Sequence, residues 1–348
     1  MILFTKNIAH ELSSYLTANK YDRIFVLTDT NTRVKCFPLL ETVVSGFDFI
    51  PIVIRAGDTH KDIGQATAVW DALSRNGATR HSLLMNVGGG MVTDLGGFAG
   101  ATFKRGLHNL NIPTTLMAAV DAAAGGKTGV NFNGLKNEIG SFYPPDCVMI
   151  DCTFLKTLNR CNLLSGYAEM LKHGLLSDRQ SFIDTLTFDV ERPDFEKLDE
   201  LVRISVAIKE RFVEKDPTET GVRKALNLGH TVGHALESLS FTGDNPVLHG
   251  HAVAAGLISE LYLSYRTCHL PVAILRQVTG FVKAHFPSIF FKCDDYDMIY
   301  GIMMHDKKNR NGRVNFTLLG DVGDFRIDQD VSKESVFESF DFYRENAC

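Results

Sequence analysis

Four polar side chains recur at helical spacing in the second half of the chain: Arg223, Asn227, His230 and His234. If residues 225–239 form one helix, this spacing places all four on one face. A solvated face would more usually carry Lys and Glu, whereas Arg, Asn and two His suit a site that holds a metal and an anion. Core histidines bonded to backbone carbonyls are the alternative. The nearby His249-Gly-His251 favours the metal site.

A carboxylate that could complete a metal site lies in the segment Gly166–His173. On a helix, Glu169 shares a face with Lys172 and His173. One interpretation is a surface Glu–Lys pair worth about a few tenths of a kcal/mol. The other makes Glu169 an oxygen ligand in a Glu/His/His set with an open position for substrate. The spacing alone does not choose Glu169 over other carboxylates.

A glycine turn in the first half has the local features of a phosphate-binding site. The run Ser82–Val87 is typical of a strand and leads through Gly88, Gly89 and Gly90 into an expected helix. Backbone N–H groups and the positive end of a helix suit a pyrophosphate. The dinucleotide pattern G-x-G-x-x-G fails because Thr93 occupies its last position, so a simple tight turn is the alternative.

Other polar residues follow the ends of expected strands. Asp29 and Asn31 end the first strand and could contact a ribose or a base, and Thr114 and Thr115 offer hydroxyls at another strand end. Ligands of parallel α/β folds bind at such ends.

The segment 121–137 is rich in glycine and small residues, which predicts a long flexible or functional loop. Lys127, among the glycines, resembles a contact to a phosphate or a carboxylate. The spacing does not match the Walker A pattern, so ATP-driven phosphoryl transfer is disfavoured.

The expected elements divide the chain into two halves. Up to about residue 150, strands at 23–28, 49–54, 82–87 and 147–150 alternate with helical segments such as 61–75 and 93–102, which predicts a parallel α/β sheet. Helical patterns then dominate, at residues 162–176, 196–214, 225–240 and 252–266, apart from a strand pair near Arg313–Leu319 after Asn311-Gly312. We place the join at Asp151–Thr153, which gives domains 1–151 and 152–348.

Composition narrows the class of protein. A chain of 348 residues exceeds the usual size of one core, so two domains are expected. The net charge of −5 disfavours nucleic acid as a partner. The chain has neither a signal-peptide run nor about 20 consecutive apolar residues, which predicts a cytoplasmic protein without a membrane partner. Its seven scattered cysteines fit neither a disulfide framework nor a zinc knuckle.

Taken in order, the motifs resemble those of the 3-dehydroquinate synthase family over roughly residues 20–320. The set runs Gly88-Gly89-Gly90, Lys104-Arg105-Gly106, Pro113-Thr114-Thr115, Gly125–Gly129, Lys136-Asn137, Ala168-Glu169, Asn227…His230…His234, His249-Gly250 and Asp306–Lys308. The resemblance implies a Rossmann-like α/β NAD-binding domain followed by an all-α metal- and substrate-binding domain. This is the fold shared with iron-containing alcohol dehydrogenases.

The resemblance also implies a reaction. It converts 3-deoxy-D-arabino-heptulosonate 7-phosphate to 3-dehydroquinate and phosphate, as a step of the shikimate pathway. Transient NAD-dependent oxidation, phosphate elimination, re-reduction and intramolecular aldol closure follow one another. NAD⁺ and a divalent metal, Zn²⁺ or Co²⁺, are the implied cofactors. The implied partners are the phosphorylated sugar acid and a second subunit in a homodimer.

Site residues follow from the resemblance position by position. The implied metal ligands are Glu169, His230 and His249. The implied NAD⁺ contacts are Asp29, Asn31, Asp58, Lys61, Gly89, Gly90, Met91, Asp94, Thr114, Thr115, Phe154 and Thr157. The implied catalytic and substrate residues are Lys127, His234, Asp121, Lys172, Asn227, Arg223, Lys209, Lys307, Arg105, Asn137 and Lys136. His234 is a candidate proton relay, and Arg105 is expected to serve a neighbouring subunit.

His251 stands where the family commonly has glutamate. We expect it next to the metal ligands or exposed, and competition for the metal is the alternative.

Three alternatives stay open on the sequence. Related sugar-phosphate cyclases share the implied fold and cofactors, but their substrates carry one anion where the heptulosonate carries two. Two anions suit the many cations of the implied site. A metal-dependent polyol dehydrogenase would bind a neutral substrate and accumulate NADH. A non-catalytic metal-binding scaffold would release no phosphate.

Overall fold

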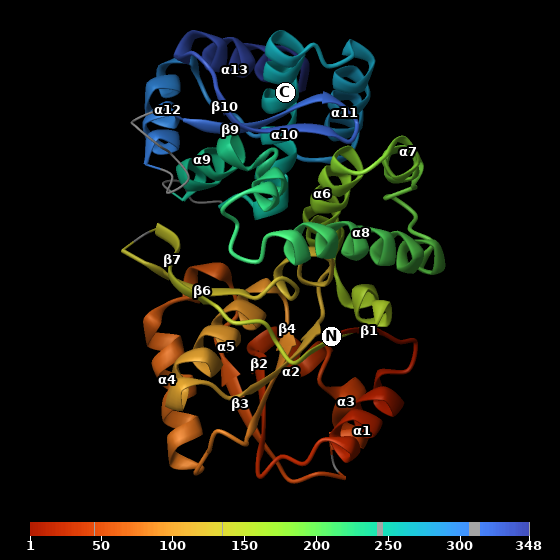
Figure 1. Ribbon diagram of the computed structural model, residues 1–348, viewed down its shortest axis with the longest axis vertical. Helices are drawn as coiled ribbons and strands as arrows, with labels where there is room; N and C mark the ends of the chain where they lie inside the picture. Colours follow the sequence, from red (N-terminus) through yellow and green to blue (C-terminus); the bar gives the residue numbers. More distant parts are fainter. Residues whose placement is uncertain (45, 134, 242–245, 306–313, 348) are drawn as a thin grey trace. The chain divides into compact units, whose positions relative to one another are not determined.

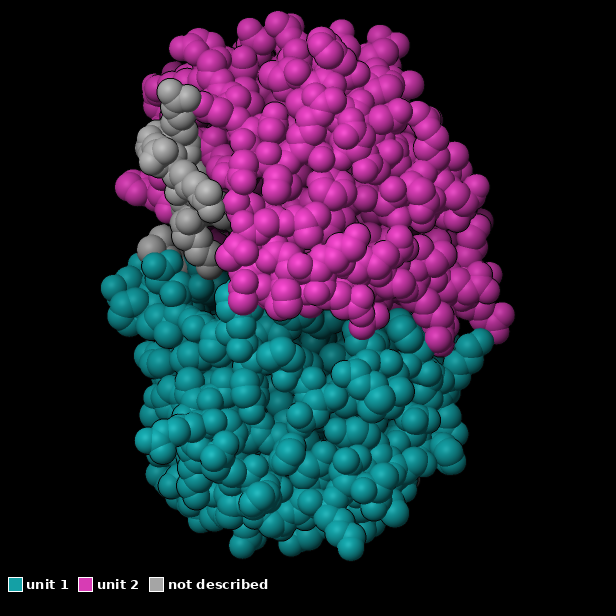
Figure 2. Space-filling model, viewed as in Figure 1, with its two compact units in different colours: residues 1–159 teal, residues 160–348 magenta. Residues whose placement is uncertain are grey.

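The structure is a computed structural model that describes residues 1–44, 46–133, 135–241, 246–305 and 314–347 (Figure 1). The chain forms two compact units, the N-terminal unit of residues 1–159 and the C-terminal unit of residues 160–348 (Figure 2). Their border follows Asn159, a few residues after the expected join. No helix within the described ranges is long and apolar enough to cross a lipid bilayer.

The N-terminal unit is built on a parallel six-stranded sheet of order β1-β8-β5-β4-β2-β3. Its strands are β1 (Ile2–Phe4), β2 (Ile24–Asp29), β3 (Phe49–Ile54), β4 (Leu83–Gly88), β5 (His108–Pro113) and β8 (Cys147–Ile150). The predicted parallel sheet is confirmed, and each of the four predicted strands lies within one residue of its observed place. Of the other two strands, β5 was expected only through its end before Thr114, and β1 escaped prediction because three residues carry too little pattern.

Helices cover both faces of this sheet, because its strands bury side chains on both sides. On one face Val26 and Met85 pack with α1 (Ile8–Ala18) and α3 (Pro38–Val44). On the other, Leu27 packs with α4 (Ile63–Arg75) and α5 (Gly90–Thr102). A short helix, α2 (Thr30–Lys35), follows β2 directly. The carboxyl ends of the parallel strands β2, β4 and β5 carry Asp29, the glycine turn and Thr114 to one edge of the sheet.

The glycine-rich segment 121–137 is not the long loop that its composition predicts. Residues Ala118–Ala122 form a short π-helix (η3), and β6 (Lys127–Phe132) pairs antiparallel with β7 (Leu135–Phe142). Gly129 lies opposite Gly140, where a Cβ would lie 2.2 Å from the Thr128 carbonyl oxygen. These two glycines therefore permit close strand pairing, which composition alone does not reveal.

The C-terminal unit is mainly helical, as expected. Its helices are α6 (Arg160–Leu176), α7 (Arg179–Thr187), α8 (Phe195–Lys215), α9 (His230–Ser240), α10 (His249–Cys268), α11 (Val272–His285), α12 (Tyr296–Met304) and α13 (Lys333–Ala347). Helix α10 packs against α6, α9, α11, α13 and the hairpin strand β9. It is the central element of this unit.

A hairpin interrupts the helices, as the strand pattern predicts. Strand β9 (Asn315–Asp321) pairs antiparallel with β10 (Asp324–Asp330). The turn is Val322-Gly323, with Gly323 at a φ of 81°, and the hairpin follows Asn311-Gly312 as expected. That dipeptide lies outside the described residues.

The predicted continuous helix over residues 225–239 is wrong. Residues Val222–Asn227 form a 3₁₀ helix (η5), and α9 begins only at His230. Gly229, between them, has a φ of 79°, a left-handed conformation that ends any right-handed helix. Arg223 and Asn227 therefore do not share a helix face with His230 and His234.

Candidate functional site

Three of the predicted residues, one from each of three helices, meet inside the C-terminal unit. Glu169 lies in the middle of α6, while His230 and His249 are the first residues of α9 and α10. Oε1 of Glu169 is 3.4 Å from Nε2 of His230 and 3.6 Å from Nε2 of His249. The Glu169 side chain is fully buried, and its Oε1 has no hydrogen-bond partner within the described ranges.

These separations suit a divalent metal better than they suit hydrogen bonds. Ligand atoms about 2.0–2.1 Å from a tetrahedral zinc ion lie roughly 3.3–3.4 Å from one another. The separations of 3.4 and 3.6 Å are long for an N–H···O bond and close to that ligand spacing. A buried carboxylate oxygen without a hydrogen-bond partner is costly, and an ion bound between Oε1 and the two imidazoles would satisfy it. The donor set therefore fits a divalent ion.

Each imidazole is held at its other ring nitrogen. Nδ1 of His249 lies 3.0 Å from Oε2 of Glu237, a buried residue of α9. Nδ1 of His230 lies 3.1 Å from the carbonyl oxygen of Leu228. Both partners are acceptors, so Nδ1 donates and Nε2 is aimed at Glu169. Glu237 was not among the predicted residues; its signal was a carboxylate next to the apolar positions Leu236 and Leu239 of the expected helix.

His234 lies beside this set, one helical turn after His230. Ligand atoms of His230, His234 and His249 lie within 4.8 Å of one another, so three imidazoles form a second conceivable ligand set. The ring centroids of His234 and His249 are 5.5 Å apart. The shorter distances to Oε1 favour Glu169 as the third ligand and place His234 next to the set rather than within it.

Burial and neighbouring charges shift the pKa values of all three proposed ligands. Burial favours the neutral acid, yet Lys172 and His230 hold the pKa of Glu169 well below its usual range. Burial and the ammonium of Lys172 lower the pKa of His230 to about 4. Burial also opposes charge on His249, but Glu237 and Glu169 outweigh it and raise its pKa to about 10. In the metal-free protein at pH 7, His230 is therefore neutral, and a metal that binds His249 must displace a proton.

Two predicted substrate lysines are buried in the same unit. Lys172 forms an ion pair with Oε2 of Glu169, and the two side chains are 1% and 0% exposed. The surface pair considered from the sequence is thereby excluded. Lys209 on α8 is buried as well. Lys307 lies outside the described residues.

Arg223 and Asn227 lie on the 3₁₀ helix η5 and not on α9. The carboxylate of Asp216 accepts the N–H groups of Gly221 and Arg223 at 2.7 and 3.0 Å. Arg223 is buried and donates from Nη1 to the Pro217 carbonyl at 2.6 Å. Asn227 donates to a carboxylate oxygen of Glu219 at 2.7 Å. The two predicted residues are therefore held by the contacts of η5 with the segment that precedes it.

His251 is buried, not exposed. Its Nε2 lies 3.1 Å from the carbonyl oxygen of Cys161, and its ring packs edge-on against Phe286. Burial lowers the pKa of this imidazole. These contacts tie α10 to the start of α6, so His251 is a packing residue in this structure.

In the N-terminal unit, the glycine turn joins the carboxyl end of β4 to α5. A Cβ on Gly89 would lie 3.0 Å from Thr115, and the N–H of Thr114 donates to the Gly88 carbonyl at 2.9 Å. Gly89 precedes the first helical residue, Gly90, and offers no side chain to cap the helix. The first N–H groups of α5 therefore suit an anionic group of a ligand.

Predicted cofactor and substrate residues meet near this turn. Nζ of Lys61 donates to Asp94 at 2.6 Å and also to the amide oxygen of Asn137. Nζ of Lys136 lies 2.8 Å from a carboxylate oxygen of Asp58. Five residues that the resemblance selects thus form two linked polar groups, brought together by the β6–β7 hairpin.

Other residues predicted to bind the cofactor make structural contacts within the N-terminal unit. Oδ1 of Asp29 accepts the N–H groups of Asn31 and Thr32, each at 2.7 Å, and so caps α2. Asn31 is exposed. Phe154 is fully buried in the core, and its carbonyl accepts from the Thr157 hydroxyl at 2.7 Å. The ring of Phe154 therefore packs with the core, which leaves its main chain as the part able to meet a ligand.

The remaining predicted site residues of this unit have half-buried or exposed side chains. Met91 is half-buried in the first turn of α5, and Asp121 is half-buried in η3. Lys127 is exposed as the first residue of β6. Arg105 is exposed with a φ of 65°, next to Lys104 with a φ of 47°. Two successive left-handed residues mark a strained turn there.

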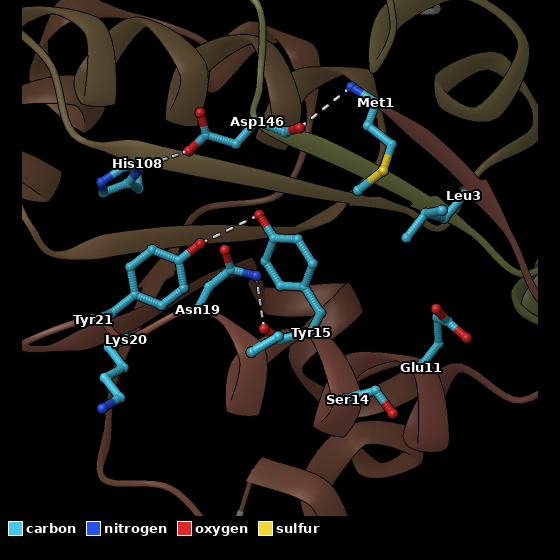
Figure 3. Close-up of a pocket in the computed structure, with 11 residues that line it drawn as sticks. Met1, Leu3, Glu11, Ser14, Tyr15, Asn19, Lys20, Tyr21, His108 and Asp146 are labelled. Carbon is cyan, nitrogen blue, oxygen red and sulfur yellow. Dashed lines mark hydrogen bonds and ion pairs between the residues drawn. The ribbon is translucent and has the colours of Figure 1, made fainter.

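A separate pocket of about 760 Å³ lies at the amino ends of β5 and β8 (Figure 3). In it, Nδ1 of His108 lies 2.9 Å from the Asp146 carboxylate, and the hydroxyls of Tyr15 and Tyr21 lie 3.2 Å apart. No predicted site residue lines it. It lies at the strand ends opposite the glycine turn and is not the candidate site.

Comparisons with known proteins assign both halves of the chain to one family. Residues 51–165 match the model described as 3-dehydroquinate synthase N-terminal, and residues 166–309 match 3-dehydroquinate synthase C-terminal. A protein of Parabacteroides distasonis named 3-dehydroquinate synthase is 58% identical over 346 residues. That alignment covers 99% of this chain and 98% of the relative.

Solved structures share the fold. A 2-deoxy-scyllo-inosose synthase complexed with carbaglucose-6-phosphate, NAD⁺ and Co²⁺ superposes with a TM-score of 0.88 at 22% identity, covering 99% and 96% of the two chains. A 2-epi-5-epi-valiolone synthase from Streptomyces hygroscopicus, with NAD⁺ and Zn²⁺ bound, gives 0.87 at 25% over the same shares. A butanol dehydrogenase from Thermotoga maritima gives 0.70 at 14%, covering 98% and 96%. The expected fold is confirmed. Because both family models and a near-full-length relative agree, the chain belongs to the 3-dehydroquinate synthase family.

Proposed function

We propose that this protein converts 3-deoxy-D-arabino-heptulosonate 7-phosphate to 3-dehydroquinate and phosphate, in the shikimate route to aromatic amino acids. The observation that carries the proposal is the buried donor set of Glu169, His230 and His249. It occurs in a chain whose relative of that name is 58% identical over nearly its whole length. The donor set offers a place for a divalent ion, and the family supplies the substrate class.

The proposed cofactors are NAD⁺ and a divalent ion, zinc or cobalt. Two cyclases of this fold were solved with NAD⁺ and Co²⁺ or Zn²⁺. When bound, NAD⁺ supplies a reversible hydride acceptor and the ion supplies Lewis acidity toward an alcohol oxygen. Glu169, His230 and His249 would hold the ion. Glu237 and the Leu228 carbonyl fix the two rings in the orientation that this needs.

We assign NAD⁺ binding to the N-terminal domain, at the carboxyl edge of its sheet. The uncapped N–H groups after Gly89 would hold the pyrophosphate. Asp29, Asn31, Thr114 and Thr115 lie at neighbouring strand ends, where a ribose or a base could bind.

The C-terminal domain is assigned the metal and the sugar acid. Its buried Lys172, Lys209 and Arg223 carry the positive charge that a phosphate and a carboxylate need. His234 would carry a proton to or from the substrate, because imidazole exchanges protons near neutral pH. Lys127, Lys136 and Asn137 of the N-terminal domain are proposed to complete the substrate contacts.

The proposal is tested by incubating purified protein with the heptulosonate phosphate, NAD⁺ and Zn²⁺, and measuring phosphate and the carbocyclic product together. We expect equal amounts of both and no accumulation of NADH, because the hydride returns to the intermediate. A protein that releases neither product does not have this function.

The same assay separates the alternatives. Turnover of sedoheptulose 7-phosphate or glucose 6-phosphate in place of the heptulosonate would indicate another sugar-phosphate cyclase. Net NADH formation from a polyol would indicate a dehydrogenase. Metal binding without any turnover would indicate a scaffold.

We also propose a cytoplasmic homodimer in which Arg105 serves the partner subunit's site. The exposure of Arg105 supports this role. Light scattering should give twice the chain mass. Mixing Arg105→Ala subunits with subunits that carry Lys172→Ala should restore part of the activity if each site uses residues of both chains.

A further inference from the structure

A buried carboxylate outside the ligand set contacts the helix that carries His230. Glu260, on α10, is fully buried. Its Oε2 accepts the N–H of Gly229 at 2.6 Å, and its Oε1 accepts the N–H of Val232 at 3.0 Å. A capping box satisfies these same two positions of a helix start with local side chains. Gly229 has no side chain, so Glu260 caps α9 from a neighbouring helix.

Glycines bring Glu260 within reach of this cap. A Cβ on Gly256 would lie 2.1 Å from the Gly229 carbonyl oxygen and 2.7 Å from the Gly233 nitrogen. A Cβ on Gly233 would lie 3.0 Å from the Ala252 carbonyl oxygen. Helices α9 and α10 therefore cross backbone to backbone, and Glu260, one turn beyond Gly256, reaches the first turn of α9.

The capped peptide also holds the imidazole of His230. The peptide group between Leu228 and Gly229 donates its N–H to Glu260, and its carbonyl oxygen accepts from Nδ1 of His230 at 3.1 Å. This group is planar, so fixing its N–H fixes the direction of its carbonyl. Hydrogen bonds in series also polarise one another, which strengthens the bond to the ring.

The two imidazoles of the ligand set thus have matching support. His249 meets the carboxylate of Glu237 directly, whereas His230 meets the carboxylate of Glu260 through one peptide group. We propose that Glu260 is a positioning residue of the metal centre, which fixes the Leu228–Gly229 peptide and thereby aims Nε2 of His230. The inference rests on the proposed metal site and adds a residue to it.

The test is Co²⁺ binding by the full-length protein and its Glu260→Gln variant. The amide keeps the shape but places an NH₂ group against one of the two N–H donors, so one bond is lost. We expect Co²⁺ affinity, measured by chelator competition, to fall about 10- to 100-fold, with a shift of the visible cobalt bands. Glu260→Asp, which keeps the charge, should recover part of the loss.

Ser264→Ala is the matched control, since Ser264 is equally buried one turn further along α10. Its Oγ accepts the N–H of Leu319 at 3.0 Å and donates to the main-chain carbonyl of Glu260 at 2.7 Å, so the variant loses buried hydrogen bonds on the same helix but keeps the Glu260 carboxylate that caps α9. This variant should lower the unfolding temperature and keep the wild-type Co²⁺ affinity and spectrum. The inference is overturned if Glu260→Gln binds Co²⁺ as the wild type does. A wild-type protein that binds no Co²⁺ would instead remove the metal site itself.

A measurement on the unmodified protein keeps the inference testable if the variants do not fold. Because linkage is reciprocal, filling the metal site should slow amide hydrogen exchange at Gly229 and Val232. Exchange at these amides that is the same with and without Zn²⁺, while exchange elsewhere in the unit slows, would contradict the proposed coupling.

Discussion

The candidate sites of the two units differ in the groups that form them: main-chain groups in the N-terminal unit and side chains in the C-terminal unit. The edge of the N-terminal sheet is made largely of main chain: strand ends, the Gly88–Gly90 turn and the first N–H groups of α5. The C-terminal centre is made of side chains from α6, α9 and α10, and main chain enters mostly as their support.

This difference predicts different responses to mutation. A main-chain site survives the loss of most single side chains, because strand pairing keeps the N–H groups in place. A centre of converging side chains depends on every ligand and on the packing that brings three helices together. Single substitutions should therefore damage the C-terminal centre much more than the N-terminal edge.

The largest effect is expected for Glu169→Gln. The variant removes the only carboxylate of the proposed ligand set and leaves Lys172 buried without its anionic partner. We expect loss of measurable phosphate release and of tight Zn²⁺ binding. The assay is phosphate release with excess Zn²⁺, beside calorimetric titration of metal. Wild-type activity in this variant would assign the ion to the three imidazoles instead.

Removal and replacement of the ligands test the same difference between the two units without mutation. Stripping with EDTA should abolish turnover, and Zn²⁺ should restore it. Added Zn²⁺ should slow hydrogen exchange in α6, α9 and α10, whereas NAD⁺ should slow it at the β4–α5 turn. Undiminished turnover in thoroughly stripped enzyme would rule out the metal assignment.

His234→Ala should lower phosphate release by about 100- to 10,000-fold, the usual contribution of a proton-transferring group. Metal affinity should change little, because Glu169 and not His234 is the proposed third ligand. Lys127→Ala should also abolish phosphate release with the fold retained, because Lys127, on β6 of the N-terminal unit, is a proposed substrate contact made by a side chain and not a part of the main-chain edge. His10→Ala and Lys6→Ala, at exposed positions, are the matched controls. Full activity in both site variants would remove the proposed substrate site.

Glu237→Gln should weaken Zn²⁺ binding by about 10- to 100-fold, since it loses the charged acceptor of the His249 ring. The change should also lower the pKa of His249 in the metal-free protein, because Glu237 is a main reason that it is raised. Nuclear magnetic resonance titration of the imidazole checks the second point. An unshifted titration would show that Glu169 alone maintains the charge.

Gly250→Ala tests the packing that brings α6 and α10 together. A Cβ there would lie 1.8 Å from the Ser165 carbonyl oxygen, so the start of α10 must move away from α6 and carry His249 with it. We expect a loss of about 1–3 kcal/mol in the free energy of unfolding, together with weaker metal binding. Gly280→Ala, where nothing lies within 4 Å, should be neutral or slightly stabilising. Equal stability of the two variants would contradict the crossing argument.

The smallest effect is expected at the N-terminal edge, for Asp29→Ala. Loss of the α2 cap should cost about 1 kcal/mol of folding free energy and weaken NAD⁺ binding modestly. Chemical denaturation and NAD⁺ titration measure the two quantities. A loss of NAD⁺ binding as complete as the loss of Zn²⁺ binding expected for Glu169→Gln would contradict the proposed difference between the main-chain edge and the side-chain centre.

Sequence patterns predicted most strands of the N-terminal sheet closely, but they predicted the elements around the ligand cluster only in part. Strand periodicity located β3 and β8 at their observed bounds, because alternation and turn residues are local properties. The helix over 225–239 failed at Gly229, whose left-handed conformation is set by the crossing with α10. The loop expected at 121–137 is a hairpin, because its glycines allow two strands to approach.

The sequence by itself determined the two-part organisation, the parallel sheet, the glycine turn and the ordered motifs that identify the family. These depend on neighbours along the chain, where spacing and residue type carry the information. The resemblance had selected Glu169, His230 and His249, but only the tertiary structure gives the distances between them, shows that Glu237 and Glu260 support the imidazoles, and shows that glycines let the helices cross so closely. Those contacts join residues from 12 to 85 positions apart, and their geometry follows from packing that no local pattern encodes.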